Sequence, residues 1–154
     1  MPFGGKKRLI GARNVRKAPP GEDMGSTERR VLLAEDEPNI VESLRFLLGR
    51  AGFEIDVSVN GREALERALD KPPDVMILDV MLPELDGFEI LERLRADDRG
   101  AQLPVIMLTA KGQRQDRDRA LAARANLFIS KPFSNTELVD AVRRLAGASV
   151  ADHG

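Results

Sequence analysis

Residues 75–87 read VMILDVMLPELDG, and this stretch decides the fold. Its first four residues form a continuous apolar run, which is typical of a strand buried on both faces of a parallel sheet. The run ends at Asp79 and is followed by a turn that contains proline and glycine. Similar apolar runs occur at residues 31–34, 105–108 and 127–129. The sequence therefore predicts a set of short, buried, parallel strands.

Amphipathic stretches separate these runs. Residues 40–48 place apolar side chains at helical spacing, with Pro38 in the first turn and Gly52 as a stop. Residues 134–137 read SNTE, a capping box that opens a last helix, which we expect to end before Gly147. The other predicted helices cover about residues 61–69, 87–95 and 113–123.

Residues 53–59 differ from the buried runs, because apolar and polar side chains alternate there. This pattern predicts a strand with one exposed face, at an edge of the sheet. Together these segments make five strand–helix repeats. Their strict alternation predicts an α/β fold with a doubly wound parallel sheet and right-handed crossovers.

Composition excludes several classes of protein. With 154 residues, 42% apolar and 32% charged, the chain suits one soluble domain. Cysteine is absent and His153 is the only histidine, which excludes disulfides, thiol chemistry, histidine triads and multi-histidine zinc sites. The longest apolar runs have about five residues, far from the ~20 that cross a bilayer, and the start does not resemble a signal peptide. We expect a cytoplasmic protein that does not associate with membranes.

Residues 1–28 differ from the rest, since they carry six basic and three acidic side chains with several glycines and prolines. We interpret them as a flexible basic N-terminal extension. It is a solvated tail or a contact for nucleic acid or an acidic partner, and Met24 is an alternative start. Residues 29–147 form the predicted domain, and residues 148–154 a disordered tail.

Polar side chains occur where the predicted strands end. The first strand leads into residues 35–37 (EDE) and the third into Asp79. The fourth ends at Thr109, and the fifth leads into Lys131. In an open parallel sheet, sites form beyond the carboxyl ends of the strands, where strand order reverses. We therefore expect carboxylates, a hydroxyl and an ammonium group along one edge.

The chemistry of such a cluster points to phosphoryl transfer. Two carboxylates about 4 Å apart repel by roughly 4 kcal/mol at an effective dielectric constant near 20, so a cation is needed. Oxygen ligands with positions open to water and phosphate favour Mg²⁺. A remaining aspartate can accept a phosphoryl group, and Lys131 and Thr109 can contact its oxygens.

Four motifs extend this interpretation: VLLAEDEP at 31–38, MILDVMLPELDG at 76–87, LTAK at 108–111 and FISKPF at 128–133. Together they resemble the receiver domains of response regulators in bacterial two-component systems, over about residues 29–147. The resemblance implies a flavodoxin-like (βα)5 fold with strand order 2-1-3-4-5.

The resemblance also implies a role for each matched position. Asp79 matches the phosphoacceptor, which a histidine kinase or a histidine phosphotransfer protein phosphorylates. Asp36 and Glu35 match the acidic pair that holds Mg²⁺, with Asp79 and the backbone carbonyl of Met81 as further ligands. Lys131 matches the lysine that contacts the phosphoryl group.

Three more expectations follow from the matched positions. The bond from Lys131 to Pro132 is expected to be cis. Thr109 matches the switch hydroxyl. Phe128 matches the aromatic residue that turns inward when Thr109 moves, and plain core packing is the alternative for its side chain.

Three positions depart from the family pattern. Glu35 stands where aspartate is common, and its longer side chain suggests a metal contact through water. Arg124 stands where the family usually has glycine, just before the fifth strand, so the backbone conformation at this position is in doubt. Met81 lies two residues after the nucleophile, where its thioether cannot orient water, so we expect slow self-dephosphorylation.

We expect a stand-alone response regulator that is no enzyme in the ordinary sense. Phosphorylation should reshape the surface of the fourth helix, fifth strand and fifth helix, which a downstream protein target reads. A dehalogenase-type phosphatase would need aspartate at Met81. The alternatives are a phosphorylation-independent scaffold, or a nucleic-acid-associated regulator that uses residues 1–28. Direct DNA binding is not expected, and phosphorylation-dependent dimerisation stays open.

Overall fold

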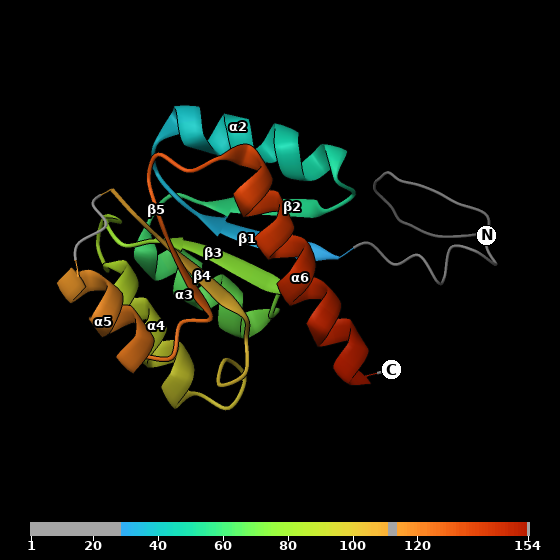
Figure 1. Cartoon of the computed structure of the whole chain (residues 1–154). Coiled ribbons are helices and arrows are strands. Elements are labelled where there is room, and N and C mark those ends of the chain that lie inside the picture. The colour runs from blue at the N-terminus through green and yellow to red at the C-terminus, as the bar shows by residue number, and fades with distance from the viewer. Residues whose placement is uncertain (1–28, 111–113, 154) are drawn as a thin grey trace.

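The computed structural model describes residues 29–110 and 114–153, in which five strands alternate with five helices (Figure 1). The strands are β1 (Arg30–Ala34), β2 (Glu54–Ser58), β3 (Val75–Asp79), β4 (Val105–Thr109) and β5 (Leu127–Ser130). The helices are α2 (Pro38–Arg50), α3 (Gly61–Asp70), α4 (Gly87–Ala96), α5 (Arg114–Ala122) and α6 (Asn135–His153). The alternation predicted from the sequence is confirmed.

The strands form one parallel sheet in the order β2-β1-β3-β4-β5. Leu33 pairs with Val57 of β2 on one side and with Ile77 of β3 on the other, so β1 is an inner strand. β2 lies at the edge, as the alternating pattern of residues 53–59 predicted. The order confirms the flavodoxin-like, doubly wound fold.

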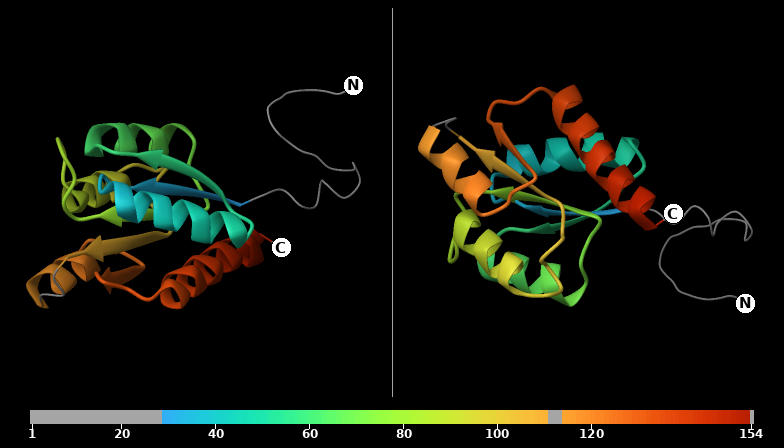
Figure 2. Two further views of the ribbon diagram at one scale, coloured as in Figure 1. Left: turned by 90° about the horizontal axis from the view of Figure 1, so that it is seen from above. Right: turned by 60° about the horizontal axis from the view of Figure 1, so that its bottom comes forward.

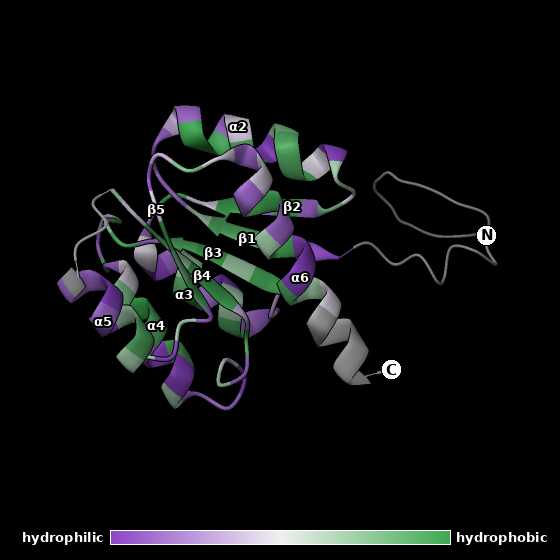
Figure 3. Cartoon of the chain, viewed as in Figure 1, coloured by the Kyte–Doolittle hydropathy of each residue, from purple (hydrophilic) through white to green (hydrophobic). Residues whose placement is uncertain are grey.

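Helices cover both faces of the sheet, with α2 and α6 on one face and α3, α4 and α5 on the other (Figure 2). Because successive side chains of a strand point to opposite faces, each inner strand contributes to two cores. In β3, Met76 and Leu78 pack toward α3 and α4, whereas Val75 and Ile77 pack toward α2 and α6. Figure 3 shows the resulting apolar strands beneath helices whose outer faces are polar.

Side-chain caps fix where several helices begin. Asn60 Oδ1 accepts a hydrogen bond from the third backbone N–H of α3, and Asp86 Oδ1 does the same for α4. Ser134 Oγ accepts a hydrogen bond from Glu137 N at 2.9 Å, as expected for the first half of the predicted capping box. Gly52 follows α2 with a φ of 98°, a conformation that glycine adopts readily.

The last helix is longer than the sequence analysis expected. Residues 148–154 were expected to be a disordered tail, whereas α6 continues to His153. Gly147 does not end the helix, because an interior glycine costs only about 1 kcal/mol relative to alanine. The alanines of this stretch favour continuation.

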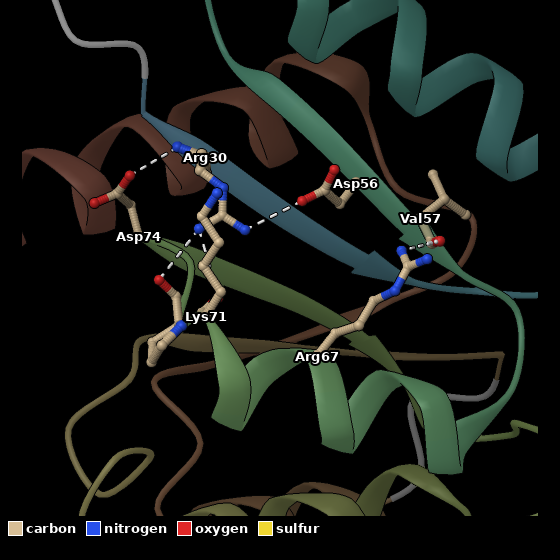
Figure 4. Close-up of polar contacts among 7 residues, drawn as sticks. Arg30, Asp56, Val57, Arg67, Lys71 and Asp74 are labelled. Atoms are coloured by element: carbon tan, nitrogen blue, oxygen red, sulfur yellow. Dashed lines mark hydrogen bonds and ion pairs between the residues drawn. The ribbon is translucent and has the colours of Figure 1, made fainter. Parts of the chain in front are cut away.

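Two arginines organise the amino edge of the sheet, the edge at which the strands begin. Arg30 donates from its backbone N to Asp74 Oδ2 at 2.7 Å, and its guanidinium reaches Asp56 Oδ2 at 3.1 Å and Lys71 O at 3.5 Å (Figure 4). These bonds connect the start of β1 with β2 and with the loop before β3.

Arg95, on α4, connects the loops that precede β4 and β5. Its guanidinium donates to the carbonyl oxygens of Gly100, Leu103 and Arg124, each at 2.8 Å, and to Asn126 Oδ1 at 3.2 Å. Burial, and next the charge of Arg124, lowers the pKa of Arg95. Its hydrogen bonds satisfy carbonyls in two loops that lie far apart in the sequence.

The predicted basic extension, residues 1–28, lies outside the described residues, so its expected role is not tested. Among the helices of residues 29–110 and 114–153, none combines the length and apolar character needed to cross a bilayer.

Candidate functional site

The carboxyl ends of the strands bring the predicted site residues to one edge of the sheet. Asp79 is the last residue of β3 and Thr109 the last of β4, while Glu35 directly follows β1 and Lys131 directly follows β5. The chain leaves β1 for α2 on one face and leaves β3 for α4 on the other. The adjacent ends of β1 and β3 are therefore the point at which strand order reverses, where sites form in such sheets.

Three carboxylates meet there. Glu35, Asp36 and Asp79 each offer an oxygen within 4.8 Å of the others. Glu35 is fully buried and Asp79 is 3% exposed, whereas Asp36 is open to solvent. The pocket thus combines two buried carboxylates with one that solvent reaches.

Lys131 is the cation of this site. Its Nζ lies 3.1 Å from Glu35 Oε1, 3.1 Å from Glu37 Oε1 and 3.4 Å from Asp79 Oδ1. Burial opposes the charge of Lys131, but the close contacts with Glu35 and Glu37 and the charges of Asp79 and Glu35 outweigh it, so its pKa is raised. The lysine therefore stays protonated, and the bond to Pro132 is cis, as expected.

Glu35 shows that one ammonium group does not satisfy the cluster. Its Oε2 accepts a hydrogen bond from Glu37 N at 3.1 Å. Its buried Oε1 has no hydrogen-bond partner among the described residues, because the contact with Lys131 is an ion pair without hydrogen-bond geometry. Burial, and next the charge of Asp79, raises the pKa of Glu35 to about 7. An incompletely satisfied buried carboxylate fits a divalent cation, and the oxygen ligands fit Mg²⁺.

Thr109 ends β4 next to Lys131 in the sheet register, whereas Phe128 lies further back along β5. Thr109 is 3% exposed, and its carbonyl accepts a hydrogen bond from Lys131 N at 2.7 Å. Phe128 is half-buried and packs against the core on the α3, α4 and α5 face, where it pairs in register with Met107. This packing is the alternative stated for Phe128, and an inward switch stays a prediction.

The loop after β3 brings its backbone close to Asp79. Met81 N lies 3.4 Å from Asp79 Oδ1, and the Met81 side chain is 70% exposed. Gly87 donates to Val80 O at 2.9 Å, and a Cβ at position 87 would lie 2.5 Å from the carbonyl oxygen of Asp79. Only glycine fits at this distance, so Gly87 fixes the loop that carries Met81.

Arg124 and Glu37 are two further residues whose structure bears on the sequence analysis. Arg124 has a φ of 70°, so the doubt about its backbone was justified: an arginine occupies a conformation that favours glycine. Glu37 was not predicted as a site residue, yet it contacts Lys131 across 94 positions of sequence. The run of three acidic residues at 35–37 was the available signal.

Fold and site together define a class: a flavodoxin-like domain with an acidic pocket, at the switch point, that fits Mg²⁺ and phosphorylation. Residues 31–143 match the model of the response regulator receiver domain. The chain therefore belongs to the response regulator receiver domain family of two-component systems.

Curated relatives agree with this assignment. RpaA of Synechocystis, described as a DNA-binding dual master transcriptional regulator, is 39% identical over 116 residues, which are 75% of this chain and 48% of RpaA. PhoB of Rhizobium meliloti, a phosphate regulon transcriptional regulatory protein, is 40% identical over 75% of this chain and 51% of its own length. The chain spans about half the length of these relatives.

Solved structures agree as well. The receiver domain of the sensor histidine kinase PA1611 from Pseudomonas aeruginosa, which holds a magnesium ion in its active-site cleft, superposes with a TM-score of 0.73 at 30% identity, covering 79% of this chain and 99% of that domain. The chemotaxis protein CheY4 of Vibrio cholerae gives a TM-score of 0.72 at 29% identity, covering 77% and 99%.

Proposed function

We propose that Asp79 accepts a phosphoryl group from a histidine kinase or a histidine phosphotransfer protein. The observation that carries the proposal is the meeting of three carboxylates within 4.8 Å beside the ammonium group of Lys131. Glu35, Asp36, Asp79 and the backbone carbonyl of Met81 would hold Mg²⁺, which supplies positive charge to the phosphoryl oxygens.

The proposed transfer is a direct displacement. A carboxylate oxygen of Asp79 attacks the phosphorus of a phosphohistidine, and the new P–O bond forms as the P–N bond breaks. The electron pair of the broken bond goes to the imidazole nitrogen, and Asp79 becomes an acyl phosphate. Lys131 holds a phosphoryl oxygen through a charge-assisted hydrogen bond, so the protein contributes positioning and charge neutralisation.

The proposed signal is a change of surface. Thr109 would move toward the new phosphoryl oxygens, and Phe128, two residues before the end of β5, would follow it inward. The α5, β5 and α6 surface would then change, and a downstream protein target would bind one state in preference to the other. Leu121 of α5 is 57% exposed and lies on a helix of this surface.

The wider role that we propose concerns the receiver domain, not the whole of a longer protein. The receiver acts as a phosphoacceptor and takes part in its own phosphoryl transfer without being an enzyme for other substrates. We propose that the domain passes on its signal by contact with another protein, although the relative RpaA is described as DNA-binding. The stand-alone organisation and the cytoplasmic location stay predictions, because the relatives are about twice as long as the matched part.

The test is Mg²⁺-dependent incorporation of phosphate from a small acyl phosphate. We expect acid-labile incorporation that a chelator abolishes, because the carboxylates need the cation to approach the anionic donor. Asp36→Asn should lose most of this incorporation at a Mg²⁺ concentration that saturates the unaltered protein. Glu66→Gln, which removes an exposed carboxylate of α3, is the control and should change nothing. Equal incorporation with and without Mg²⁺ would contradict the proposal.

A further inference from the structure

Three carboxylates surround the ammonium group of Lys131, and they are not held equally. An ammonium group has three N–H donors. Glu35, Glu37 and Asp79 each place an oxygen 3.1–3.4 Å from Lys131 Nζ, and among the described residues the contact with Glu37 is the one with hydrogen-bond geometry. A phosphoryl oxygen that takes the N–H donor now bound to Glu37 must therefore displace the Glu37 carboxylate.

Exposure shows which carboxylate can leave. The side chains of Glu35 and Asp79 are 0% and 5% exposed, and both are held by further hydrogen bonds from backbone N–H groups. The side chain of Glu37 is 60% exposed, and within the described residues Lys131 is the one side chain with which it forms a hydrogen bond or ion pair. The side chain of Glu37 can rotate into the solvent without leaving a buried charge behind.

The position of Glu37 at the start of α2 supports this difference. It is the N-cap residue of α2 and precedes Pro38, which favours the extended backbone observed there, with φ −80° and ψ 116°. Its side chain accepts no hydrogen bond from the helix, and the first turn of α2 has no acidic residue. The carboxylate is turned toward Lys131 instead, although the N-terminus of a helix favours a negative charge.

We propose that Glu37 is a positioning residue that occupies the phosphoryl-binding direction of Lys131 until the phosphoryl group displaces it. The inference rests on the proposed function and adds that Glu37 competes with the phosphoryl group for Lys131. Glu37 lowers the rate of phosphorylation at low donor concentration, because its ion pair must break first. Once displaced, its carboxylate is free to cap α2.

The test compares phosphorylation rates of four proteins at low concentrations of a small acyl phosphate with saturating Mg²⁺. Exposed ion pairs of this kind are weak, so we expect Glu37→Gln to react about threefold faster. Glu37→Asp keeps the charge but shortens the side chain beyond reach of Lys131, and it should be accelerated equally. Glu84→Gln, which removes one exposed carboxylate from the loop after β3 at the same edge, should keep the unaltered rate.

The pattern of rates decides the question. If Glu37→Asp reacts at the unaltered rate while Glu37→Gln is faster, charge repulsion explains the effect and displacement is wrong. Unaltered rates in both variants would also overturn the inference and leave the proposed function standing. Failure of the unaltered protein to incorporate phosphate would overturn both.

A second measurement follows the displacement itself. In protein labelled with ¹³C, the carboxyl signal of Glu37, assigned by its loss in Glu37→Gln, should shift when Asp79 is phosphorylated. A merely structural Glu37 would keep its signal, and an unchanged position would contradict the inference.

Discussion

The two edges of the sheet use charge in opposite ways. At the amino edge, Arg95 gives its donors to three carbonyl oxygens and one side-chain amide oxygen. At the carboxyl edge, the carboxylates of Glu35, Glu37 and Asp79 surround the ammonium group of Lys131, and Asp36 lies close to two of them. Within the described part of the chain, the buried Glu35 Oε1 has no hydrogen-bond partner. The first edge satisfies loop carbonyls, whereas the second concentrates like charges that repel.

This difference separates stability from chemistry. Substitutions at the amino edge should change the free energy of unfolding and leave phosphorylation intact. Substitutions of Glu35, Asp36, Asp79 or Lys131 at the carboxyl edge should change phosphorylation, and removal of a carboxylate from this cluster should relieve repulsion. The four predictions that follow test the separation, from the largest expected free-energy change to the smallest.

Arg95→Ala should lower the free energy of unfolding by about 4 kcal/mol, because two partly buried carbonyls and two exposed oxygens lose their charged donor together. Urea denaturation measures the change. Arg93→Ala is the matched control on the same helix, and its exposed pair with Glu89 is worth about 0.5 kcal/mol or less. Similar losses in the two variants would show that Arg95 is an ordinary surface residue.

Glu35 should make the metal-free domain less stable as pH rises. Its pKa of about 7 lies above the ordinary 4.5, so the folded state binds the proton more tightly than the unfolded state. The contribution of Glu35 to the free energy of unfolding is therefore fully present below about pH 4.5 and is lost as the pH rises through 7. The loss is at most about 3 kcal/mol, since one unit of pKa corresponds to about 1.4 kcal/mol.

Unfolding curves of the unaltered protein and Glu35→Gln, taken without metal across this pH range, isolate the effect. The variant should become relatively more stable as pH rises, and Mg²⁺ should reduce the difference because it stabilises the ionised carboxylate. A difference that stays constant with pH would contradict the assignment.

Met81 should make the acyl phosphate long-lived, because an exposed thioether beside Asp79 cannot orient an attacking water. Met81→Asn supplies an amide that can, and it should shorten the lifetime about tenfold, which corresponds to about 1.4 kcal/mol in the barrier. Loss of acid-labile phosphate after removal of the donor measures the lifetime. Val59→Asn, an exposed site after β2, is the control. A half-life of seconds in the unaltered protein would contradict the prediction.

Arg124→Gly should stabilise the domain by about 0.5 kcal/mol. Glycine removes the strain of a positive φ, and part of this gain is lost to the greater entropy of the unfolded chain. The carbonyl of residue 124 remains available to Arg95. Arg124→Ala keeps the strain and should not stabilise, so equal unfolding midpoints for the two variants would show that the backbone is unstrained.

The sequence predicted those features that follow from periodicity and strand ends. Apolar runs located the buried strands, and the alternating pattern placed β2 at the edge. The position of Asp79 and Thr109 at one edge was predicted because parallel strands bring their carboxyl ends together there. These features depend on the backbone path, which local patterns largely determine.

Side-chain partners were not predictable in the same way. The contact between Glu37 and Lys131 depends on how two loops 94 residues apart approach each other. The bonds of Arg95 depend on its rotamer and on loop carbonyls that carry no sequence signal. The end of α6 was wrongly predicted because glycine was taken as a stop in an alanine-rich stretch.

The central claim, that Asp79 is the phosphoacceptor at the carboxyl edge, is tested most directly by locating the phosphoryl group. The measurement is acid-labile phosphate incorporation from a small acyl phosphate with Mg²⁺, in the unaltered protein, Asp79→Asn and Asp98→Asn, an exposed aspartate near the amino edge. We predict loss of incorporation in Asp79→Asn alone. Incorporation that persists in Asp79→Asn would contradict the account.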